Sequence, residues 1–343
     1  MIEQAIRKIS ERIDLTQQEA FETVSEIVGG QASEVQIAAF LLGLRVKGET
    51  VEEIAGGVRA LLSAANRIQP RVDGCVDIVG TGGDCTGTFN ISSAAALVAA
   101  GAGAVVAKHG NRSVSSKSGS ADVFEALGLD LSLTPQEAES CLEENGFAFL
   151  FAPVYHPAMR YAGPVRRQLG VRTLFNLLGP LANPASASSM VLGVCDRSLL
   201  TFMAETLREL GVVHALVVSG HDGTDEISIS GATEFCELKD GQLSSGIMTP
   251  EQFGLKSAPL SAISGGTPAD NARMIEDILA GRQGATRDIV LFNAGATLYV
   301  SGRAASIAEG ISMARHSIDS GAARKKLVVL RKYRTQVRAG EAI

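Results

Sequence analysis

The sequence lacks several features that define other classes of protein. It has no apolar run long enough to span a bilayer, and charged residues interrupt residues 1–20, so we expect neither a transmembrane helix nor a secretion signal. Its 5 cysteines are widely separated and form no Cys-x-x-Cys pair, which indicates neither a zinc site nor a disulfide framework and favours a reducing cytoplasm. The net charge is -6 and the basic cluster at residues 324–326 is short, so we expect no nucleic-acid partner.

The first 72 residues indicate helices only. Three capping boxes mark helix starts, at Thr16–Glu19, Ser33–Gln36 and Thr50–Glu53. After Ser33, one apolar stripe at helical spacing consists of Ile37, Phe40, Leu41 and Leu44. We interpret this stripe as domain core in preference to a dimer face, because most amphipathic helices bury their stripe within the chain.

From about residue 73 the pattern changes to alternating strands and helices. A strand at 76–79, a small-residue helix at 91–100 and a strand at 104–107 form one βαβ unit. Later strands are predicted at 190–194, 214–218 and 288–292, with helices at 199–210 and 269–279. We therefore expect an α/β protein with a small all-helical domain and a larger α/β domain, whose central, largely parallel sheet is flanked by helices.

The domain boundaries follow from the same change of pattern. We predict a helical domain over residues 1–72, with residues 155–185 returning to it because this segment breaks the α/β rhythm. Residues 73–154 and 186–343 then form the α/β domain.

Two polar loops follow the first two predicted strands. The first begins with Gly80-Thr81-Gly82-Gly83-Asp84, where glycines let the backbone approach an anion at the start of the next helix. A structural turn with an N-cap explains the glycines equally well. The second loop, residues 108–120, combines cations, hydroxyls and glycine, which suits a phosphorylated ligand, although a solvated loop remains open. Both loops leave the same sheet edge, so we expect them to face each other.

A third polar segment contains two adjacent carboxylates, Asp225 and Glu226. Mg²⁺ is commonly held by one or two carboxylates together with substrate phosphates. By spacing alone, a polar turn is the better interpretation of this segment. The dinucleotide pattern Gly-x-Gly-x-x-Gly fails at Cys85, and no Gly-Lys-Ser/Thr triplet of a P-loop occurs.

Several longer motifs together carry a family resemblance. They are Gly80-Thr81-Gly82-Gly83-Asp84, Thr88-Phe89-Asn90-Ile91-Ser92, Lys108-His109-Gly110-Asn111-Arg112, Val165-Arg166-Arg167, Arg172 to Leu181, and Asp225-Glu226. In this order and over essentially the whole chain, they resemble the anthranilate phosphoribosyltransferases. Cys85 and Ser93 differ from the glycine and threonine that are frequent there. The absence of tryptophan would be economical in an enzyme of tryptophan biosynthesis.

The resemblance implies a reaction, a metal and partners. The enzyme would transfer the phosphoribosyl group of phosphoribosyl pyrophosphate (PRPP) to the amine of anthranilate, with Mg²⁺ as cofactor. It would be a cytoplasmic homodimer that associates through its helical domain. Catalysis would depend on positioning by Lys108, Asn111 and Arg166, without a general acid or base.

The resemblance also implies the residues of the site. PRPP would be held by Gly80, Gly83, Asp84, Thr88, Asn90, Ser92, Ser93, Lys108, His109, Gly110, Asn111, Arg112, Ser113, Ser115, Ser116 and Ser120. Anthranilate would contact Gly80, His109, Asn111, Arg166 and Pro180, with Arg166 paired to its carboxylate. The metal would be bound by Ser92, Asp225 and Glu226.

Two alternatives stay open. A pyrimidine nucleoside phosphorylase shares the architecture, but it would be expected to carry a lysine and serine triplet in the glycine loop. A catalytically silent nucleic-acid-binding relative would be expected to be basic along one face, whereas the pI here is about 5.5.

Overall fold

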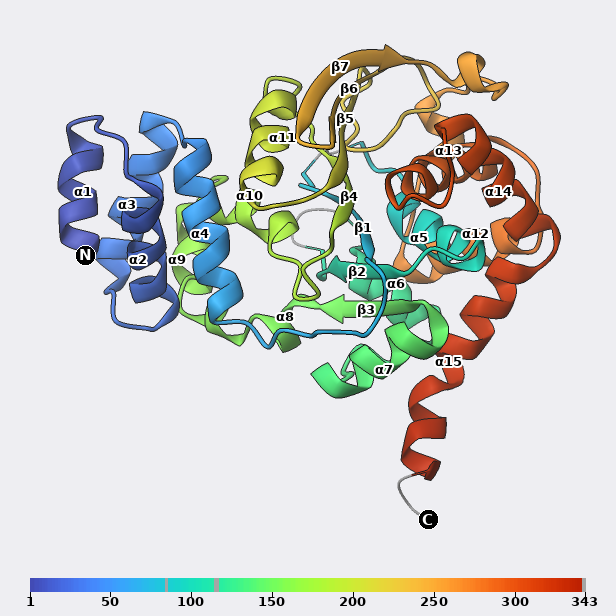
Figure 1. Cartoon of the computed structure of the whole chain (residues 1–343), viewed down its shortest axis with the longest axis horizontal. Coiled ribbons are helices and arrows are strands. Elements are labelled where there is room, and N and C mark those ends of the chain that lie inside the picture. The colour runs from blue at the N-terminus through green and yellow to red at the C-terminus, as the bar shows by residue number, and fades with distance from the viewer. Residues whose placement is uncertain (84–85, 114–116, 341–343) are drawn as a thin grey trace.

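The structure, a computed structural model, describes residues 1–83, 86–113 and 117–340. Over these residues, no helix is both long and apolar enough to cross a membrane. A helical bundle lies at one end of the molecule, a sheet lies in the middle, and the C-terminal helices cover the far side of the sheet (Figure 1).

The N-terminal bundle contains α1 (Ile2–Ser10), α2 (Gln17–Val28), α3 (Glu34–Lys47) and α4 (Val51–Ser63). Thr16, Ser33 and Thr50 are the N-caps of α2, α3 and α4, and each forms the predicted capping box. The predicted stripe of α3 is buried, which confirms its interpretation as core.

Over the described residues, seven strands form one sheet in the order β3-β2-β1-β4-β5-β6-β7. They are β1 (Val76–Gly80), β2 (Val106–Gly110), β3 (Phe147–Phe151), β4 (Ser189–Gly193), β5 (His214–Gly220), β6 (Thr233–Lys239) and β7 (Gln242–Met248). β1 to β5 are parallel, and β6 and β7 are antiparallel, so the predicted largely parallel sheet is confirmed. The chain runs outward from β1 in one direction and then, from β4, in the other, and ligands of open α/β sheets bind at such a switch point.

Helices follow or connect the strands. They are α5 (Ile91–Gly101), α6 (Ser120–Ala126), α7 (Pro135–Asn145), α8 (Ala152–Tyr155), α9 (Gly163–Leu169), α10 (Leu174–Leu181), α11 (Leu199–Glu209), α12 (Pro268–Leu279), α13 (Ala285–Val300), α14 (Ile307–Asp319) and α15 (Ala322–Gly340). Three short 3-10 helices are η1 (Pro157–Arg160), η2 (Pro250–Phe253) and η3 (Leu260–Ile263). The predicted helices at 91–100, 199–210 and 269–279 are confirmed as α5, α11 and α12.

One predicted strand is wrong. Residues 288–292 lie inside helix α13 and not in the sheet. The segment Asp288-Ile289-Val290-Leu291-Phe292 contains a run of apolar residues, and a fully buried helix produces the same pattern as a buried strand. The predicted strand at 104–107 is present as β2 but begins at Val106.

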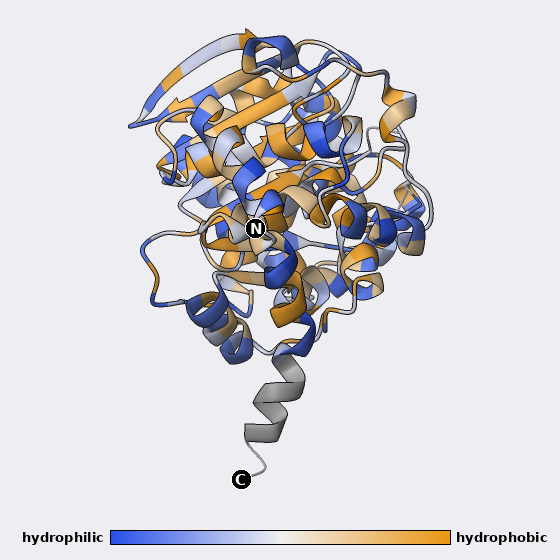
Figure 2. Cartoon of the chain, turned by 90° about the vertical axis from the view of Figure 1, so that its right-hand side faces the viewer, coloured by the Kyte–Doolittle hydropathy of each residue, from blue (hydrophilic) through white to orange (hydrophobic). Residues whose placement is uncertain are grey.

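The sheet separates two hydrophobic clusters. Val191, Leu216 and Val218 face a cluster that contains α5 and α13, whereas Met190 and Val217 face one that contains α11 and the helical bundle. This alternation is the period of a β-strand that is buried on both sides. Figure 2 views the α14 side, where hydrophilic and hydrophobic residues are interspersed along the helices, as in helices that bury one face.

Candidate active site

Four parallel strands end in glycine at one edge of the sheet. These glycines are Gly80 of β1, Gly110 of β2, Gly193 of β4 and Gly220 of β5. A Cβ atom at Gly80, Gly193 or Gly220 would collide with a residue of the loop after β5, and one at Gly110 would collide with Ser120 of α6 and Phe149 of β3. The absence of side chains therefore lets the loop after β5 and the start of α6 pack directly on the strand ends.

The loop after β1 takes backbone conformations that favour glycine. Gly82, Gly83 and Gly87 have positive φ angles of 68°, 78° and 69°. Thr88 pairs with Ser264 in an isolated β-bridge, and α5 then begins at Ile91. The positive end of α5 therefore lies beside the glycine loop, as an anion site requires. Asp84, which is predicted to hold PRPP, lies outside the described residues.

The two adjacent carboxylates reach this loop from the segment after β5. Asp225 Oδ2 accepts a hydrogen bond from the backbone N–H of Gly82 at 2.7 Å, and Glu226 Oε1 accepts one from Ser92 N–H at 3.1 Å. The structure thus brings together the first and third polar segments of the sequence. The two carboxylates therefore accept hydrogen bonds from backbone N–H groups in the region that is predicted to bind an anion.

The chemistry of this donor set fits Mg²⁺. Asp225, Glu226 and the Ser92 hydroxyl offer oxygen ligands only, and hard cations prefer oxygen. Among the described residues, no group of three or more His, Cys, Asp or Glu side chains is arranged to hold a metal. Mg²⁺ is commonly held by one or two carboxylates together with water molecules and substrate phosphates.

Lys108 lies beneath the glycine loop and is almost fully buried. Its Nζ donates to the carbonyl of Ile78 at 2.6 Å and to Ser92 Oγ at 3.3 Å. Burial lowers the pKa of Lys108, while the negative charges of Asp77, Glu226 and Asp225 oppose that effect. Lys108 therefore joins β1 to the start of α5 below the predicted diphosphate site.

Asp77 is a buried carboxylate that the sequence interpretation missed. It accepts hydrogen bonds from Asn183 Nδ2 at 2.7 Å and from His109 N–H at 3.3 Å. Burial raises the pKa of Asp77 to about 6, although the Lys108 charge and these hydrogen bonds oppose the shift. Asn183 Nδ2 also donates to Ala107 O at 2.8 Å. The hydrogen bonds of Asn183 to Asp77 and Ala107 therefore connect β1 and β2 to the segment that follows α10.

His109 and His156 form a buried ring pair below the second loop. Their ring centroids are 5.2 Å apart. Burial is the main cause that lowers the pKa of His109 to about 3, so its ring is neutral at physiological pH. His156 Nε2 contacts Ala182 O at 2.8 Å, whereas His109 Nε2 and His156 Nδ1 have no hydrogen-bond partner among the described residues.

Arg166 on α9 is a largely buried cation. Its guanidinium lies over the ring of Phe175, 5.6 Å from the centroid. Its Nε atom is buried without a hydrogen-bond partner among the described residues, and burial lowers the pKa of Arg166. Pro180, the other residue predicted on the anthranilate side, is buried inside α10. A buried guanidinium of this kind is suited to pair with an anion.

The second loop is held against α6. Asp122 Oδ2 accepts hydrogen bonds from the N–H groups of Ser113 and Gly119, at 3.0 and 2.9 Å. The Arg112 side chain forms ion pairs with Asp122 and Glu125. Ser115 and Ser116 lie outside the described residues. Arg112 is therefore directed to α6 in this structure, whereas Asn111 is exposed.

Three further predicted residues have structural partners or are buried. Asn90 hydrogen bonds with Ser118 and accepts from Asn271 Nδ2 at 2.9 Å, so it joins the two loops to α12. Ser120 Oγ donates to the Asn111 carbonyl at 3.4 Å. Ser93 is fully buried.

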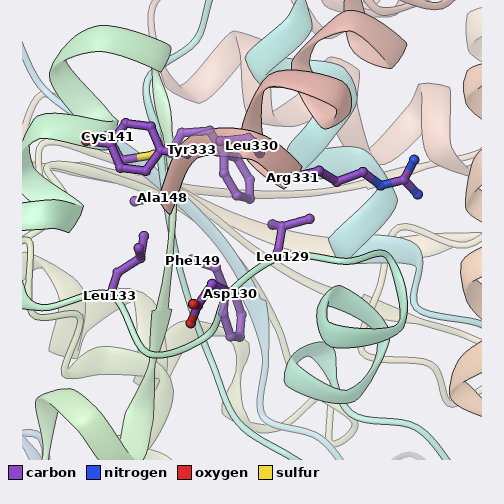
Figure 3. A pocket seen from close by; sticks show the side chains of 10 residues that line it. Leu129, Asp130, Leu133, Cys141, Ala148, Phe149, Leu330, Arg331 and Tyr333 are labelled. Carbon is purple, nitrogen blue, oxygen red and sulfur yellow. The ribbon is translucent and has the colours of Figure 1, made fainter. Parts of the chain in front are cut away.

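One cavity is separate from these loops. It measures about 20 Å³ and is lined by residues of β3, α7 and α15, among them Cys141, Phe149 and Tyr333 (Figure 3). Because this volume holds about one water molecule, the cavity is no substrate site.

Comparison with known proteins first defines the class. The model of the glycosyl transferase family, helical bundle domain, matches residues 3–65, and that of the glycosyl transferase family, a/b domain, matches residues 72–324. The chain therefore belongs to the glycosyl transferase family that combines a helical bundle domain with an a/b domain.

Individual relatives define the family more closely. Anthranilate phosphoribosyltransferase of Thioalkalivibrio sulfidiphilus is 51% identical over 95% of this chain and 96% of its own. The crystal structure of anthranilate phosphoribosyltransferase from Thermus thermophilus has a TM-score of 0.92 at 44% identity, with 96% of this chain and 98% of that chain covered. The Saccharomyces cerevisiae enzyme in complex with PRPP and Mg has a TM-score of 0.89 at 28% identity, with 98% of both chains covered. This chain belongs to the anthranilate phosphoribosyltransferase family.

Proposed function

We propose that this enzyme transfers the phosphoribosyl group of PRPP to the amine of anthranilate, giving N-(5-phosphoribosyl)anthranilate and diphosphate, a step of tryptophan biosynthesis. The observation that carries the proposal is the sheet edge where the glycine loop, the start of α5 and the pair Asp225–Glu226 meet. Its N–H groups and carboxylates suit a diphosphate and Mg²⁺ together. PRPP and Mg bind the yeast relative.

Arg166 supports anthranilate as the acceptor. Its guanidinium is largely buried, and the anthranilate carboxylate would supply the missing anionic partner. His109, which is neutral at physiological pH, would line the path of the aromatic ring and leave the amine uncharged. Asn111 and Pro180 would complete this side of the site.

The reaction forms a bond from the amine nitrogen to C1 of the ribose and breaks the bond from C1 to diphosphate. Diphosphate leaves with the bonding electron pair, and the amine nitrogen loses one proton. Mg²⁺, when bound, supplies charge that stabilises the departing diphosphate. The Gly82 N–H, which donates to Asp225 Oδ2 in this structure, would turn to the same oxygens when Asp225 binds the cation. Lys108 would hold β1 and the start of α5 together beneath the diphosphate.

Positioning provides most of the catalysis in this proposal. An aromatic amine is already nucleophilic at neutral pH, so no general base is assigned. Orientation of two substrates can supply on the order of 7–11 kcal/mol. Approach of the helical part to the α/β part would exclude water from the reacting C1 atom.

The chain organisation is part of the same proposal. We assign residues 1–72 and 155–185 to the helical domain, and residues 73–154 and 186–343 to the α/β domain. Helices α9 and α10 support this division, because α9 contacts α3, and α10 contacts both α3 and α4 of the N-terminal bundle. We further propose a cytoplasmic homodimer that associates through the helical domain.

A pyrimidine nucleoside phosphorylase and a silent nucleic-acid-binding relative receive no support from the proteins compared above. The deciding experiment follows anthranilate fluorescence in a mixture of the purified protein, Mg²⁺ and PRPP, with each component omitted in turn. We expect the fluorescence to fall only in the complete mixture. No fall with folded protein would overturn the proposed function.

A further inference from the structure

The loop that carries the acidic pair is closed by a ring of hydroxyl groups. Asp222 accepts hydrogen bonds from Thr224 N–H at 3.1 Å and from Thr224 Oγ1 at 2.7 Å. The hydroxyls of Ser228 and Ser230 donate to its other oxygen. One carboxylate thus ties the residues before the acidic pair to those after it. Thr224 and Ser228 are almost completely buried, so water does not compete strongly for these bonds.

A second anchor comes from helix α13. Asn293 Oδ1 accepts from the backbone N–H of Ile227 at 3.0 Å, and Asn293 Nδ2 donates to the carbonyl of the same residue at 2.9 Å. Asn293 Nδ2 donates its second proton to the carbonyl of Ile289 at 3.0 Å. Asn293 is fully buried in an otherwise apolar stretch. A buried amide is tolerated only when its polar atoms are paired, and here both backbone groups of Ile227 provide the pairing.

The glycine strand ends fix the same segment from a third side. The main chain of Asp225 lies where a Cβ atom of Gly193 would stand, and its carboxylate lies where a Cβ atom of Gly80 would stand. Asp225, the first residue of the acidic pair, therefore packs against the ends of β1 and β4. Ile227, the residue directly after the pair, is held by the two hydrogen bonds of Asn293, which we call the Asn293 clamp.

We propose that Asn293 is a positioning residue for the acidic pair, holding Asp225 and Glu226 in place for the cation through the backbone of Ile227. This inference rests on the proposed function. The two carboxylates point to different partners, the N–H groups of Gly82 and Ser92, and like charges on adjacent residues repel each other. The clamp keeps this divergent geometry before the cation arrives, which lowers the ordering cost of binding.

The test replaces Asn293 with leucine, which is similar in size but makes no hydrogen bond. Mn²⁺ serves as the probe in the presence of inorganic diphosphate, and its affinity is measured by electron paramagnetic resonance. We expect Asn293→Leu to weaken Mn²⁺ binding roughly 10- to 100-fold, as is typical when a partner behind a metal ligand is lost. Amide hydrogen exchange at Ile227 should accelerate at the same time.

Thr297→Val is the matched control. Thr297 is buried on the same helix, and its hydroxyl donates to the Asn293 carbonyl without contacting the acidic loop. We expect Thr297→Val to keep parental Mn²⁺ affinity, even if it lowers thermal stability. Asp225→Asn with Glu226→Gln defines the signal that remains when the pair itself is lost.

Asp222→Asn provides a second route if Asn293→Leu does not fold, because it loosens the other anchor of the loop and should also weaken Mn²⁺ binding. The inference would be overturned if a folded Asn293→Leu protein bound Mn²⁺ as tightly as the parent although its Ile227 amide exchanged faster. If the parent consumes no anthranilate but Asn293→Leu still loses Mn²⁺ affinity, the proposed function fails and the positioning role stands.

Discussion

At the scale of single residues, Arg166 is the side chain whose environment points most directly to a ligand. Its Nε atom is buried and unpaired among the described residues, and an aromatic ring covers its guanidinium. A charge-assisted hydrogen bond to a substrate carboxylate would contribute about 1.5–3 kcal/mol. Arg166→Ala should therefore raise KM for anthranilate about 10- to 100-fold while KM for PRPP stays nearly constant.

Steady-state kinetics with each substrate varied in turn measures this split. Arg167→Ala is the control, because Arg167 is the exposed neighbour on the same helix. An unchanged KM for anthranilate in Arg166→Ala would remove the carboxylate contact from the proposed site.

Asp77 gives a prediction about stability and pH. Its pKa is raised from 3.8 to about 6 by burial. Between these values the folded protein keeps the proton and the unfolded chain has lost it, so the stability contributed by Asp77 falls as pH rises through this window. Once pH exceeds the folded pKa, the loss is complete and amounts to roughly 3 kcal/mol.

Urea unfolding of the parent and of Asp77→Asn at about pH 4.5 and pH 7 isolates this effect. The parent should lose stability relative to the variant as pH increases. A difference between the two proteins that does not change with pH would mean that Asp77 has an ordinary pKa.

The sequence predicts residues whose chemistry is visible in a short motif. The glycines at 80–83 and the pair Asp225–Glu226 are recognised in this way, and the structure places them together. Asp77, Asn183 and Asn293 were missed because their partners lie 32 to 106 residues away. A lone polar residue within an apolar stretch, such as Asp77 in Val-Asp-Ile-Val, is the only local sign of such a contact.

At the scale of secondary-structure elements, helix starts are predicted well because a capping box is a local signal. The β6–β7 hairpin was missed, although its Asp240-Gly241 turn is visible in the sequence. Both residues have positive φ, 49° and 76°, as this type of hairpin turn requires. α13 was mistaken for a strand because it is buried around nearly its whole circumference, which removes the helical period.

The junction of α3 and α4 depends on one buried ion pair. Glu53 accepts hydrogen bonds from the N–H groups of Leu15 and Thr50, both at 2.9 Å, and pairs with Lys47 at 3.1 Å. Glu53→Ala would leave the N–H groups of Leu15 and Thr50 without their acceptor, while Lys47 would still pair with Asp14, so the change should cost about 1–3 kcal/mol for each N–H group that stays unpaired.

Thr50→Ala is the comparison, since it removes only the hydroxyl cap of α4 and should cost about 1 kcal/mol. Urea unfolding followed by helical circular dichroism measures both values. If the two variants lost the same free energy of unfolding, the Lys47–Glu53 pair would contribute nothing to stability beyond the capping of α4.

At the scale of the whole molecule, the chain passes three times between the bundle and the sheet, and the three passages are hydrogen bonded to one another. Asn66 donates its backbone N–H to Tyr155 O and its side-chain amide to Val154 O, and Ile68 N–H donates to Pro184 O. A relative movement of the two parts must therefore bend three linked segments.

The bundle also has an exposed apolar face that bears on assembly. Val35, Leu42 and Val46 of α3 are 79%, 45% and 70% exposed, and their spacing places them on one side of the helix, opposite the buried stripe. A stable dimer interface buries about 1,200–2,000 Å² with an apolar centre, and this face supplies such a centre on the domain proposed to dimerise.

Leu42→Asp with Val46→Asp should convert the proposed dimer to a monomer, because burial of two unpaired carboxylates in an apolar interface is strongly unfavourable. Multi-angle light scattering at micromolar concentration measures the mass. Val213→Asp is the control, since Val213 is 58% exposed on the α/β part and its variant should remain dimeric. The monomer should keep transferase activity, because the proposed site residues all come from one chain. A dimer of unchanged stability in the double variant would place the interface on another surface.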